Sequence, residues 1–542
     1  MNTLKALINN QFPATELVEG ENLSIEVAPG ELRELVGFLY NYAPHPFDYL
    51  VYLIGTDDGE NLGVTYLLSS SVQPSIQIIL KTSTPDRVNP LLYSVTDFYE
   101  TAHFNEREVF AMYGIRFINN PDMRRFLLND SWNGFPLRKD YNPDETLNPL
   151  SVESKDVVDL APRIMEVDGT FVEETVRVFE EDDYIINIGP QHPSTHGVMH
   201  FRTALDGEIV KKIDVHSGYI HRGIEKLCEG MTYPHTLHFT DRLDYISAGM
   251  NRHALCMCVE KAAGIEVPER AQYIRTIMDE LNRISSHLVA WAAQTNDLGA
   301  TTAFIYGMRE REIVLDIFDK TCGGRLIINN NVIGGVMFDI YPQFQADVKA
   351  FIPYMREKLK EYDRFFSHNV IALGRMKNIG LLSKKDAISY AVTGPAGRAS
   401  GWSCDVRKHQ PYAVYNKVDF QEVLRSEGDS YARYLNRLDE IEQSLYIIEQ
   451  LIDNIPSGDF CAKTKAIIKL PEGEYFQHVE AGKGLFGVYI QSKGDKTPHR
   501  LKFRSPSMAL VSVMPLICKG EKISDFIGIG GSMDYVIPDI DR

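Results

Sequence analysis

Residues 189–197 read Gly189-Pro190-Gln191-His192-Pro193-Ser194-Thr195-His196-Gly197, and the runs on either side of this stretch indicate the fold around it. Residues 184–188 form a short apolar run, and residues 198–204 alternate apolar and polar side chains. Asp206-Gly207 then separates this second run from a third at residues 208–215. An Asp-Gly pair in this position is typical of a β-hairpin, because both turn residues tolerate positive φ. We therefore expect a loop, stiffened by its two prolines, between two paired strands.

The loop presents two histidines, His192 and His196, on backbone that the strands hold in place. Histidines four residues apart share one face only on a helix, and Pro190 and Pro193 exclude a helix here. We therefore predict no metal pair from this spacing. A packed or hydrogen-bonded structural role is the alternative for His192, whereas His196 is the stronger functional candidate.

Length and charge limit the classes of protein to consider. A chain of 542 residues is long for a single core, so two or more domains are expected. The formal net charge of 56 − 74 = −18 argues against a nucleic-acid surface and against charge-driven docking on anionic lipid. No run approaches the roughly 18–20 uncharged residues of a transmembrane helix, and the N-terminus lacks the apolar core of a signal peptide. We therefore expect a cytoplasmic protein.

The seven cysteines contain no C-x-x-C pair. The one close pair, Cys256 and Cys258, has a spacing that points the two thiols to different sides of a helix. Buried, reduced and unligated thiols are expected, and with them no metal or iron–sulfur ligand set in this chain.

Residues 1–141 are predicted to form a small α+β domain. Two helices are expected, the second ended by Gly114, with three β-rich runs between them. These elements are the helices 29–42 and 95–113 and the strands 47–55, 62–69 and 75–81. Residues 142–183 are rich in Pro, Asp and Glu, and we interpret them as an acidic linker, extended or partly helical.

Residues 184–542 are predicted to form a second domain. Beyond the first hairpin, apolar residues recur at three- and four-residue spacing, which predicts a mainly α-helical core. The expected helices are 243–263, 268–294, 300–322, 343–366 and 429–455. Two further strands, 484–491 and 499–504, are expected near the C-terminus. The fold class is therefore α+β, with a helical core flanked by β-structure.

Two parts of the chain resemble subunits of one enzyme. Residues 105–141 resemble the 30-kDa-type subunit of respiratory NADH:quinone oxidoreductase, complex I, and residues 184–542 resemble its 49-kDa-type, quinone-binding subunit. The first match rests on Asn105-Glu106-Arg107-Glu108-Val109-Phe110-Ala111-Met112-Tyr113-Gly114, Arg124-Arg125 and Pro136-Leu137-Arg138-Lys139-Asp140-Tyr141. The second rests on residues 189–197, Gly218-Tyr219-Ile220-His221-Arg222-Gly223-Ile224-Glu225-Lys226, Arg242-Leu243-Asp244-Tyr245, Glu280-Leu281-Asn282-Arg283 with His287, and Asp541-Arg542. The whole is similar to the fused C/D subunits of some bacteria.

The chain departs from this family pattern at several positions. Ala111 and Asn120 stand where an Asp and a His are expected. Residues 327–332 read Ile-Ile-Asn-Asn-Asn-Val, with Asn329 to Asn331 in a stretch where His and Arg are expected, and Pro538 replaces a Gly.

The resemblance implies a peripheral-arm subunit that reduces quinone and binds no cofactor by itself. Electrons from NADH would reach the quinone through FMN and iron–sulfur clusters that partner subunits hold. The implied partners are the small iron–sulfur subunit with the terminal cluster and a membrane subunit that lines the quinone channel. The implied location is the cytoplasmic side of the bacterial inner membrane, in a proton-translocating complex.

The resemblance also assigns roles to individual residues. It makes Tyr245 and His196 the hydrogen-bond and proton donors to the quinone, and Asp297 the carboxylate partner of His196. A neutral Tyr, with a reference pKa of about 10, and a His near 6.5 suit this chemistry. The alternatives are a core tyrosine for Tyr245 and a helix-terminal cap for Asp297. Four further residues are candidates that support the site, His192, Arg222, Arg242 and His287. The alternative is a surface or interfacial ion pair for the two arginines and a buried structural pair with a carboxylate or carbonyl for His287.

Two other functions compete with this interpretation. Large subunits of membrane-bound [NiFe] hydrogenases belong to the same superfamily and share the element Arg222-Gly223-Ile224-Glu225. They bind nickel and iron through two cysteine pairs, which residues 242–245 and 534–541 replace here, and Asp does not substitute for soft thiolate ligands. A non-catalytic scaffold is the second alternative, and the retention of His196, Tyr245 and Asp297 argues against it.

Overall fold

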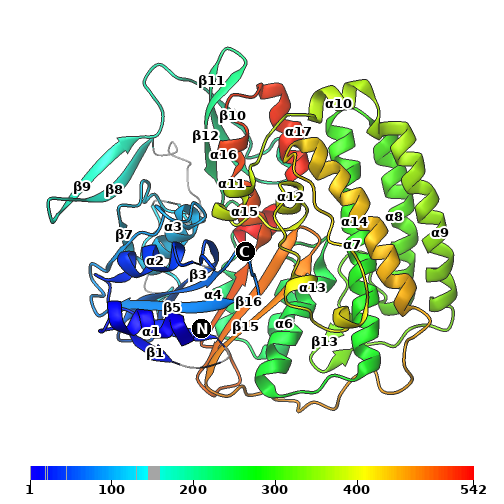
Figure 1. The fold of residues 1–542 in the computed structure, drawn as a ribbon, viewed down its shortest axis with the longest axis horizontal. Coiled ribbons are helices and arrows are strands. Elements are labelled where there is room, and N and C mark those ends of the chain that lie inside the picture. The colour runs from blue at the N-terminus through cyan, green and yellow to red at the C-terminus, as the bar shows by residue number, and fades with distance from the viewer. Residues whose placement is uncertain (1, 19, 21, 44, 130, 145–158) are drawn as a thin grey trace.

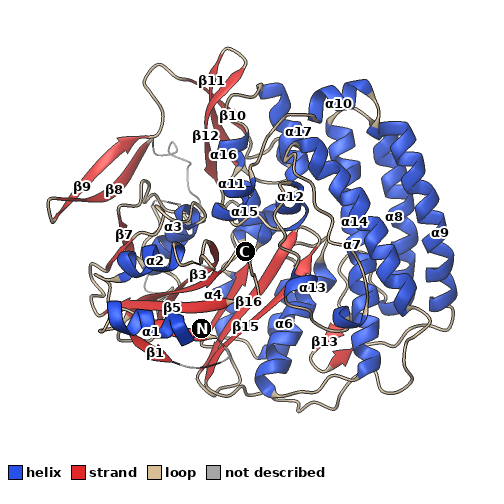
Figure 2. Cartoon of the chain, viewed as in Figure 1, coloured by secondary structure: helices blue, strands red, loops and turns tan. Residues whose placement is uncertain are grey.

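The computed structural model describes residues 2–18, 20, 22–43, 45–129, 131–144 and 159–542. Most strands lie on one side of the molecule and the long helices on the other (Figures 1 and 2). The structure therefore belongs to the α+β class that the sequence predicts.

The N-terminal region is built on a five-stranded sheet in the order β1-β2-β5-β4-β3. Neighbouring strands are antiparallel except for the parallel pair β2 and β5. The first predicted helix and the three predicted β-rich runs are confirmed. The elements are α1 (Asn2–Gln11), β1 (Glu16–Val18), β2 (Leu23–Glu26), α2 (Leu32–Tyr40), β3 (Tyr49–Asp57), β4 (Leu62–Ser69) and β5 (Gln77–Thr84).

The second predicted helix of this region is shorter than expected. α3 covers Ala102–Tyr113, and residues 95–101 form turns instead. The buried Glu106 carboxylate accepts hydrogen bonds from the Ser94 hydroxyl at 2.8 Å and the Val95 amide at 2.9 Å, which holds this backbone outside the helix. Gly114 ends α3 as predicted, with φ of 77°.

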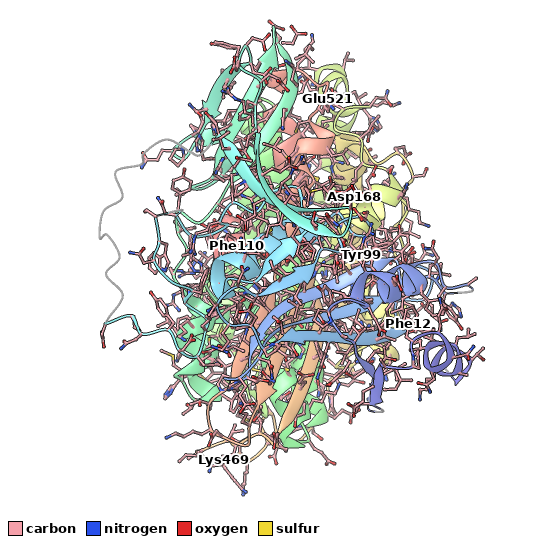
Figure 3. All side chains as sticks on the ribbon, turned by 90° about the vertical axis from the view of Figure 1, so that its left-hand side faces the viewer. Phe12, Tyr99, Phe110, Asp168, Lys469 and Glu521 are labelled. Carbon is pink, nitrogen blue, oxygen red and sulfur yellow. The ribbon has the colours of Figure 1, made fainter. Side chains whose placement is uncertain are left out.

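The stretch interpreted as an acidic linker contains a β-hairpin, so the expectation of extended or partly helical chain was wrong for residues 160–177. β8 (Leu160–Val167) and β9 (Thr170–Arg177) are antiparallel and extend a sheet with β6 (Leu91–Tyr93) and β7 (Arg116–Ile118). The hairpin points away from the helical core, with Asp168 at its turn (Figures 1 and 3). Neither strand alternates apolar and polar residues, and the pairing with β7 is non-local. Residues 145–158 of the linker lie outside the described residues.

The predicted loop and hairpin around residues 189–197 are confirmed. β10 (Tyr184–Ile188), β11 (His200–Asp206) and β12 (Ile209–His216) form an antiparallel sheet in that order. The loop between β10 and β11 contains one short 3₁₀ turn, η1 (Pro193–Thr195).

The second half of the chain has the predicted helical core. α7 packs against α8, α14 and α17, and its last residue is Asp297. The helix expected from residue 243 begins only at Ala248, so Tyr245 lies in a turn before it. The elements are α4 (Ile224–Glu229), α5 (Tyr233–Thr240), α6 (Ala248–Ala263), α7 (Glu269–Asp297), α8 (Thr301–Cys322), β13 (Asn331–Val332), β14 (Gly335–Val336), α9 (Phe344–Tyr362), η2 (Asp363–Ser367), α10 (Val370–Met376), α11 (Lys384–Ser389), α12 (Gly394–Ala399), α13 (Val406–His409), η3 (Tyr415–Lys417) and α14 (Ser430–Leu451).

The C-terminal part returns to β-structure, as predicted, and then to short helices. A three-stranded sheet forms in the order β15-β16-β17, of which β15 was not predicted. The elements are β15 (Gly473–Ala481), β16 (Gly484–Ser492), β17 (Arg500–Arg504), α15 (Pro506–Ser512), α16 (Met514–Ile517), α17 (Ile523–Met533) and α18 (Ile537–Asp541).

The N-terminal region and the helical core are joined by buried apolar and ionic contacts. Most buried apolar side chains between Leu4 and Ile540 belong to one contiguous core, which includes both regions. At the junction, Glu108 of α3 pairs with Lys502 and Arg542, and Glu225 of α4 pairs with Arg500, all buried. The division into domains at residues 141 and 183 stays a prediction.

Candidate functional site

The loop that carries His196 is held by close backbone contacts. A Cβ atom at Gly189, where φ is 96°, would lie 1.8 Å from the Met199 carbonyl oxygen, so only glycine fits. A Cβ at Gly197 would lie 2.6 Å from Ile537 Cγ1, which shows how closely the loop packs on α18. Inside the loop, the Thr195 hydroxyl lies 2.7 Å from the His192 carbonyl oxygen. His196 itself has φ of 52°, and this local geometry directs its ring.

His196 faces the carboxylate at the end of α7. Its Nε2 lies 3.1 Å from Asp297 Oδ1 and 3.0 Å from Oδ2. The imidazole is 32% exposed and the carboxylate 11% exposed, so the pair sits at the edge of the core. The hydrogen bond to Asp297 raises the pKa of His196 above its ordinary value, although partial burial opposes this shift.

The close approach of α17 to Asp297 requires a glycine. A Cβ at Gly531 would lie 2.5 Å from Asp297 Oδ2. We predict that Gly531→Ala displaces the carboxylate, lowers the pKa of His196 and lowers the free energy of unfolding by about 1–3 kcal/mol, the range for overpacking. Denaturant unfolding and an NMR titration of His196 in the full chain measure both effects.

Gly528, on the same helix, is the matched control for this prediction. A Cβ there meets Leu298 Cδ2 at 3.4 Å, an ordinary van der Waals contact. Gly528→Ala is therefore expected to leave the pKa of His196 unchanged. Equal stability and equal His196 titration in the two variants would contradict the prediction.

Tyr245 lies in the turn before α6 and is 37% exposed. Burial of the rest of its ring and the adjacent Asp244 raise its pKa above the ordinary value. The phenol therefore stays protonated at neutral pH and can donate a hydrogen bond to a molecule at the surface.

A buried ionic group that the sequence analysis did not single out lies behind these residues. Lys483 Nζ is 3.3 Å from Asp244 Oδ2 and 3.5 Å from Asp534 Oδ2, and all three side chains are mostly or wholly buried. Asp534 contributes to the raised pKa of His196, after Asp297, and of Tyr245, after burial and Asp244. A lysine between two glycines, Gly482 and Gly484, in a mainly apolar run is the signal that sequence reasoning passed over.

The other candidate residues lie in two different settings. His192 is exposed on the loop. Arg222 and Arg242 are exposed neighbours, with Arg222 Nη2 donating to the Arg242 carbonyl oxygen at 3.0 Å. His287 is buried inside the helix bundle and pairs with Glu440 Oε2 at 2.9 Å, the structural pair that the sequence left open. It precedes Asp297 by ten residues on α7, about 15 Å along the helix.

The residues that depart from the family pattern fit their surroundings in the structure. Asn120 is buried and donates to Glu106 Oε2 at 2.7 Å, and Asn331 donates to the Gly249 carbonyl oxygen at 2.9 Å. Ala111 is buried, and Pro538 lies in the first turn of α18, where its missing N–H has no helical partner to lose.

All seven cysteines are free, and five of them are buried. Within the described ranges, no three His, Cys, Asp or Glu side chains converge as a metal-binding group. Among the described residues, each helix is too short or too polar to span a membrane.

Comparison with known proteins identifies relatives over nearly the whole chain. The family "Respiratory-chain NADH dehydrogenase, 30 Kd subunit" matches residues 25–147, and the corresponding "49 Kd subunit" family matches residues 297–470 and 460–542. The C/D subunit of NADH-quinone oxidoreductase from Phocaeicola vulgatus is 57% identical over 497 residues, which cover 91% of this chain and 95% of that protein. The C/D subunit from Bacteroides fragilis is 55% identical over 507 residues, with the same two shares. The D subunit from Bacillus cereus is 43% identical over 361 residues, 66% of this chain and 99% of that protein. With both families matched in order and such identity over full-length fused relatives, the chain belongs to the family of NADH-quinone oxidoreductase C/D subunits.

Proposed function

We propose that this subunit forms the quinone reduction site of its enzyme, together with a neighbouring iron–sulfur subunit. The observation that carries the proposal is the pairing of His196 with Asp297 at 3.0–3.1 Å on a partly exposed loop. The negative charge of Asp534 raises the pKa of His196 and also that of Tyr245, an exposed tyrosine. Two donors of different acidity, one on a loop and one in a turn, suit a ring with a carbonyl oxygen on each side.

Reduction of a quinone to a quinol takes up two electrons and two protons. NADH supplies the electrons through FMN and clusters that the partner subunits hold, and this chain supplies hydrogen bonds and protons. His196 Nε2 is occupied by Asp297, so Nδ1 is the ring nitrogen available to one quinone oxygen. The Tyr245 hydroxyl donates to the other oxygen, and both groups regain their protons from solvent.

The Asp297 carboxylate has two effects in this scheme. It stabilises the imidazolium form of His196 and so readies the ring as a proton donor. Once His196 has given its proton to the quinol, Asp297 loses its cation, and an unpaired charge at the edge of the core is unfavourable by several kcal/mol. Relaxation of this charge is the step that we propose couples quinone reduction to distant proton pumping.

The proposal also specifies the partner subunits and the side of the membrane on which this subunit lies. The family assignment makes other subunits of the same enzyme its partners. We assign the small iron–sulfur subunit to the open side of the His196 loop and a membrane subunit to the quinone channel. The protein then lies as a peripheral subunit on the cytoplasmic side of the inner membrane.

The contact between two distant segments argues against the hydrogenase alternative. Residues 242–245 and 534–541, which stand where hydrogenases carry cysteine pairs, meet at Lys483 through Asp244 and Asp534. An ammonium between two carboxylates is not a donor set for nickel and iron, which need thiolates. The scaffold alternative is separated from the proposal by the experiment that follows.

Asp297→Asn tests the proposal through the pH dependence of quinone reduction. The pair raises the pKa of His196, so in the wild type the imidazolium persists to higher pH. Without the carboxylate, the pKa falls and the donor form is lost earlier as the pH rises. At alkaline pH, we expect the rate of quinone reduction in Asp297→Asn to fall about tenfold below the wild type for each unit by which the pKa of His196 falls. At acid pH, we expect little difference between the two. Rates to quinone and to an artificial acceptor upstream are compared in native membranes.

The upstream rate is the internal control, because it reports assembly of the enzyme without the quinone step. A pH profile of quinone reduction that coincides with the wild type would show that the pair has no part in the reaction. A scaffold role predicts that outcome.

A further inference from the structure

Two buried arginines lie one turn apart on α14 and are bonded very differently. Arg433 donates to Ser532 Oγ and the Gly428 carbonyl oxygen at 2.9 Å, and to the Gly380 carbonyl oxygen at 3.0 Å. Arg437 is 2% exposed, yet its hydrogen bond within the described structure is a 3.4 Å contact to the Arg433 carbonyl oxygen. Its Nε is buried and has no hydrogen-bond partner among the described residues. A buried guanidinium with so few partners is costly unless a nearby charge compensates it.

The nearest carboxylate to Arg437 is Asp534, whose Oδ2 lies 3.9 Å from Nε. This separation is long for a buried pair in this protein. Arg275 lies 2.6 Å from Glu260, and Arg398 lies 2.7 Å from Glu480. Arg437 therefore stands beside Asp534 without a hydrogen bond to it.

A second carboxylate, Glu440, lies three residues further along α14 and is already engaged. It accepts from Arg398 Nε at 2.8 Å and pairs with His287 at 2.9 Å. Because the charge of Glu440 is already compensated by these two partners, a further ion pair with Arg437 would stabilise Glu440 less than it would stabilise Asp534. Asp534 Oδ2 accepts no hydrogen bond in the described structure, and its other cation, Lys483, is 3.5 Å away and shared with Asp244.

We propose that Arg437 is a positioning residue for the quinone site, which moves onto Asp534 when His196 gives up its proton. The inference rests on the proposed function. Loss of the His196 proton removes the cation that faces Asp297, while Lys483 stays shared between Asp244 and Asp534, so the local charge becomes more negative. That change attracts the Arg437 guanidinium across the 3.9 Å gap to Asp534. The movement offsets the negative charge that proton release leaves at the site, and it reverses when His196 takes up a proton again.

A double-mutant cycle between Arg437 and Asp534 tests the inference in the assembled enzyme. The variants are Arg437→Met, Asp534→Asn and their combination, with Arg437→Lys as the conservative replacement. Turnover with quinone is divided by the rate to the upstream artificial acceptor, so that loss of assembly does not enter the comparison. We expect Arg437→Met to lower this ratio about tenfold, through kcat and not through the KM for quinone. Arg437→Lys is expected to restore most of it.

The decisive result is the combination. If Arg437 acts through Asp534, Arg437→Met has no further effect once Asp534 is Asn. If the fold-losses of the two single variants multiply in the double variant, the two residues act separately and the inference is overturned. The matched control is Arg433→Met, an equally buried arginine on the same helix, which is expected to lower stability without changing the normalised turnover.

Tyr245→Phe, measured in the same assay, separates the inference from the function on which it rests. If Tyr245→Phe loses quinone reduction while Arg437→Met keeps it, only the inference fails. If Tyr245→Phe keeps normal quinone reduction, the proposed quinone site fails and the inference fails with it.

Discussion

Tyr245→Phe is expected to lower electron transfer to quinone by at least about a hundredfold, while electron transfer to an artificial upstream acceptor stays near normal. The substitution keeps the ring and removes only the hydroxyl. That hydroxyl is the proposed hydrogen-bond and proton donor to one quinone oxygen, and loss of such a donor typically costs about 10²–10⁴ in rate. Because the side chain is 37% exposed, little packing is lost with it. Both rates are measured side by side in native membranes.

Tyr446 on α14, which is 42% exposed, provides a control of similar exposure. Tyr446→Phe is expected to leave both rates unchanged. If both rates persist in Tyr245→Phe, Tyr245 is a structural residue and the site lies elsewhere. If both rates collapse, the substitution prevents assembly, and a scaffold role for this region gains support.

Glu108→Ala is expected to lower the free energy of unfolding by about 3–5 kcal/mol, the cost of removing one partner from a buried ionic group. Burial alone raises the pKa of Glu108, but Arg542 and Lys502 hold it below its ordinary value, so the carboxylate is charged in the folded protein. Its removal leaves Lys502 and Arg542, which are 4% and 3% exposed, short of negative charge. Denaturant unfolding of the full chain measures the loss.

Glu173 on β9 is the matched control, because it pairs with Arg116 but is 70% exposed. Exposed pairs contribute little to stability, so Glu173→Ala is expected to unfold like the wild type. Equal stability of Glu108→Ala and Glu173→Ala would show that the buried ions at the junction do not hold the N-terminal region to the core.

The elements that depend on local pattern were predicted well. α7 was expected at residues 268–294 and covers Glu269–Asp297, and β4 was expected at 62–69 and covers Leu62–Ser69. Amphipathic spacing over many residues and a mainly apolar run are strong signals, because burial of one face or of a whole strand dominates their energetics. The hairpin after residues 189–197 followed from its Asp-Gly turn, because both turn residues tolerate positive φ.

Elements were missed where a non-local partner overrides the local pattern. The β8–β9 hairpin lacks an alternating apolar pattern and joins a sheet through β7, more than 40 residues earlier in the chain. The first turns expected for α3 do not form because Glu106 captures the amide of Val95. In both places the backbone is held by hydrogen bonds to residues outside the local stretch, and the spacing of apolar residues carries no information about those bonds.

The sequence by itself determined the fold class, the long helices, the loop at residues 189–197 and, through the family motifs, the residues His196, Tyr245 and Asp297 as candidates. Only the tertiary structure decided which charges surround them. Asp244, Lys483 and Asp534 come together from positions up to 290 residues apart, and Arg437 approaches them from a fourth segment. Sequence spacing records neighbours along a strand or a helix, whereas the electrostatics of a buried group depend on distances of a few ångströms between segments, which only the packed chain defines.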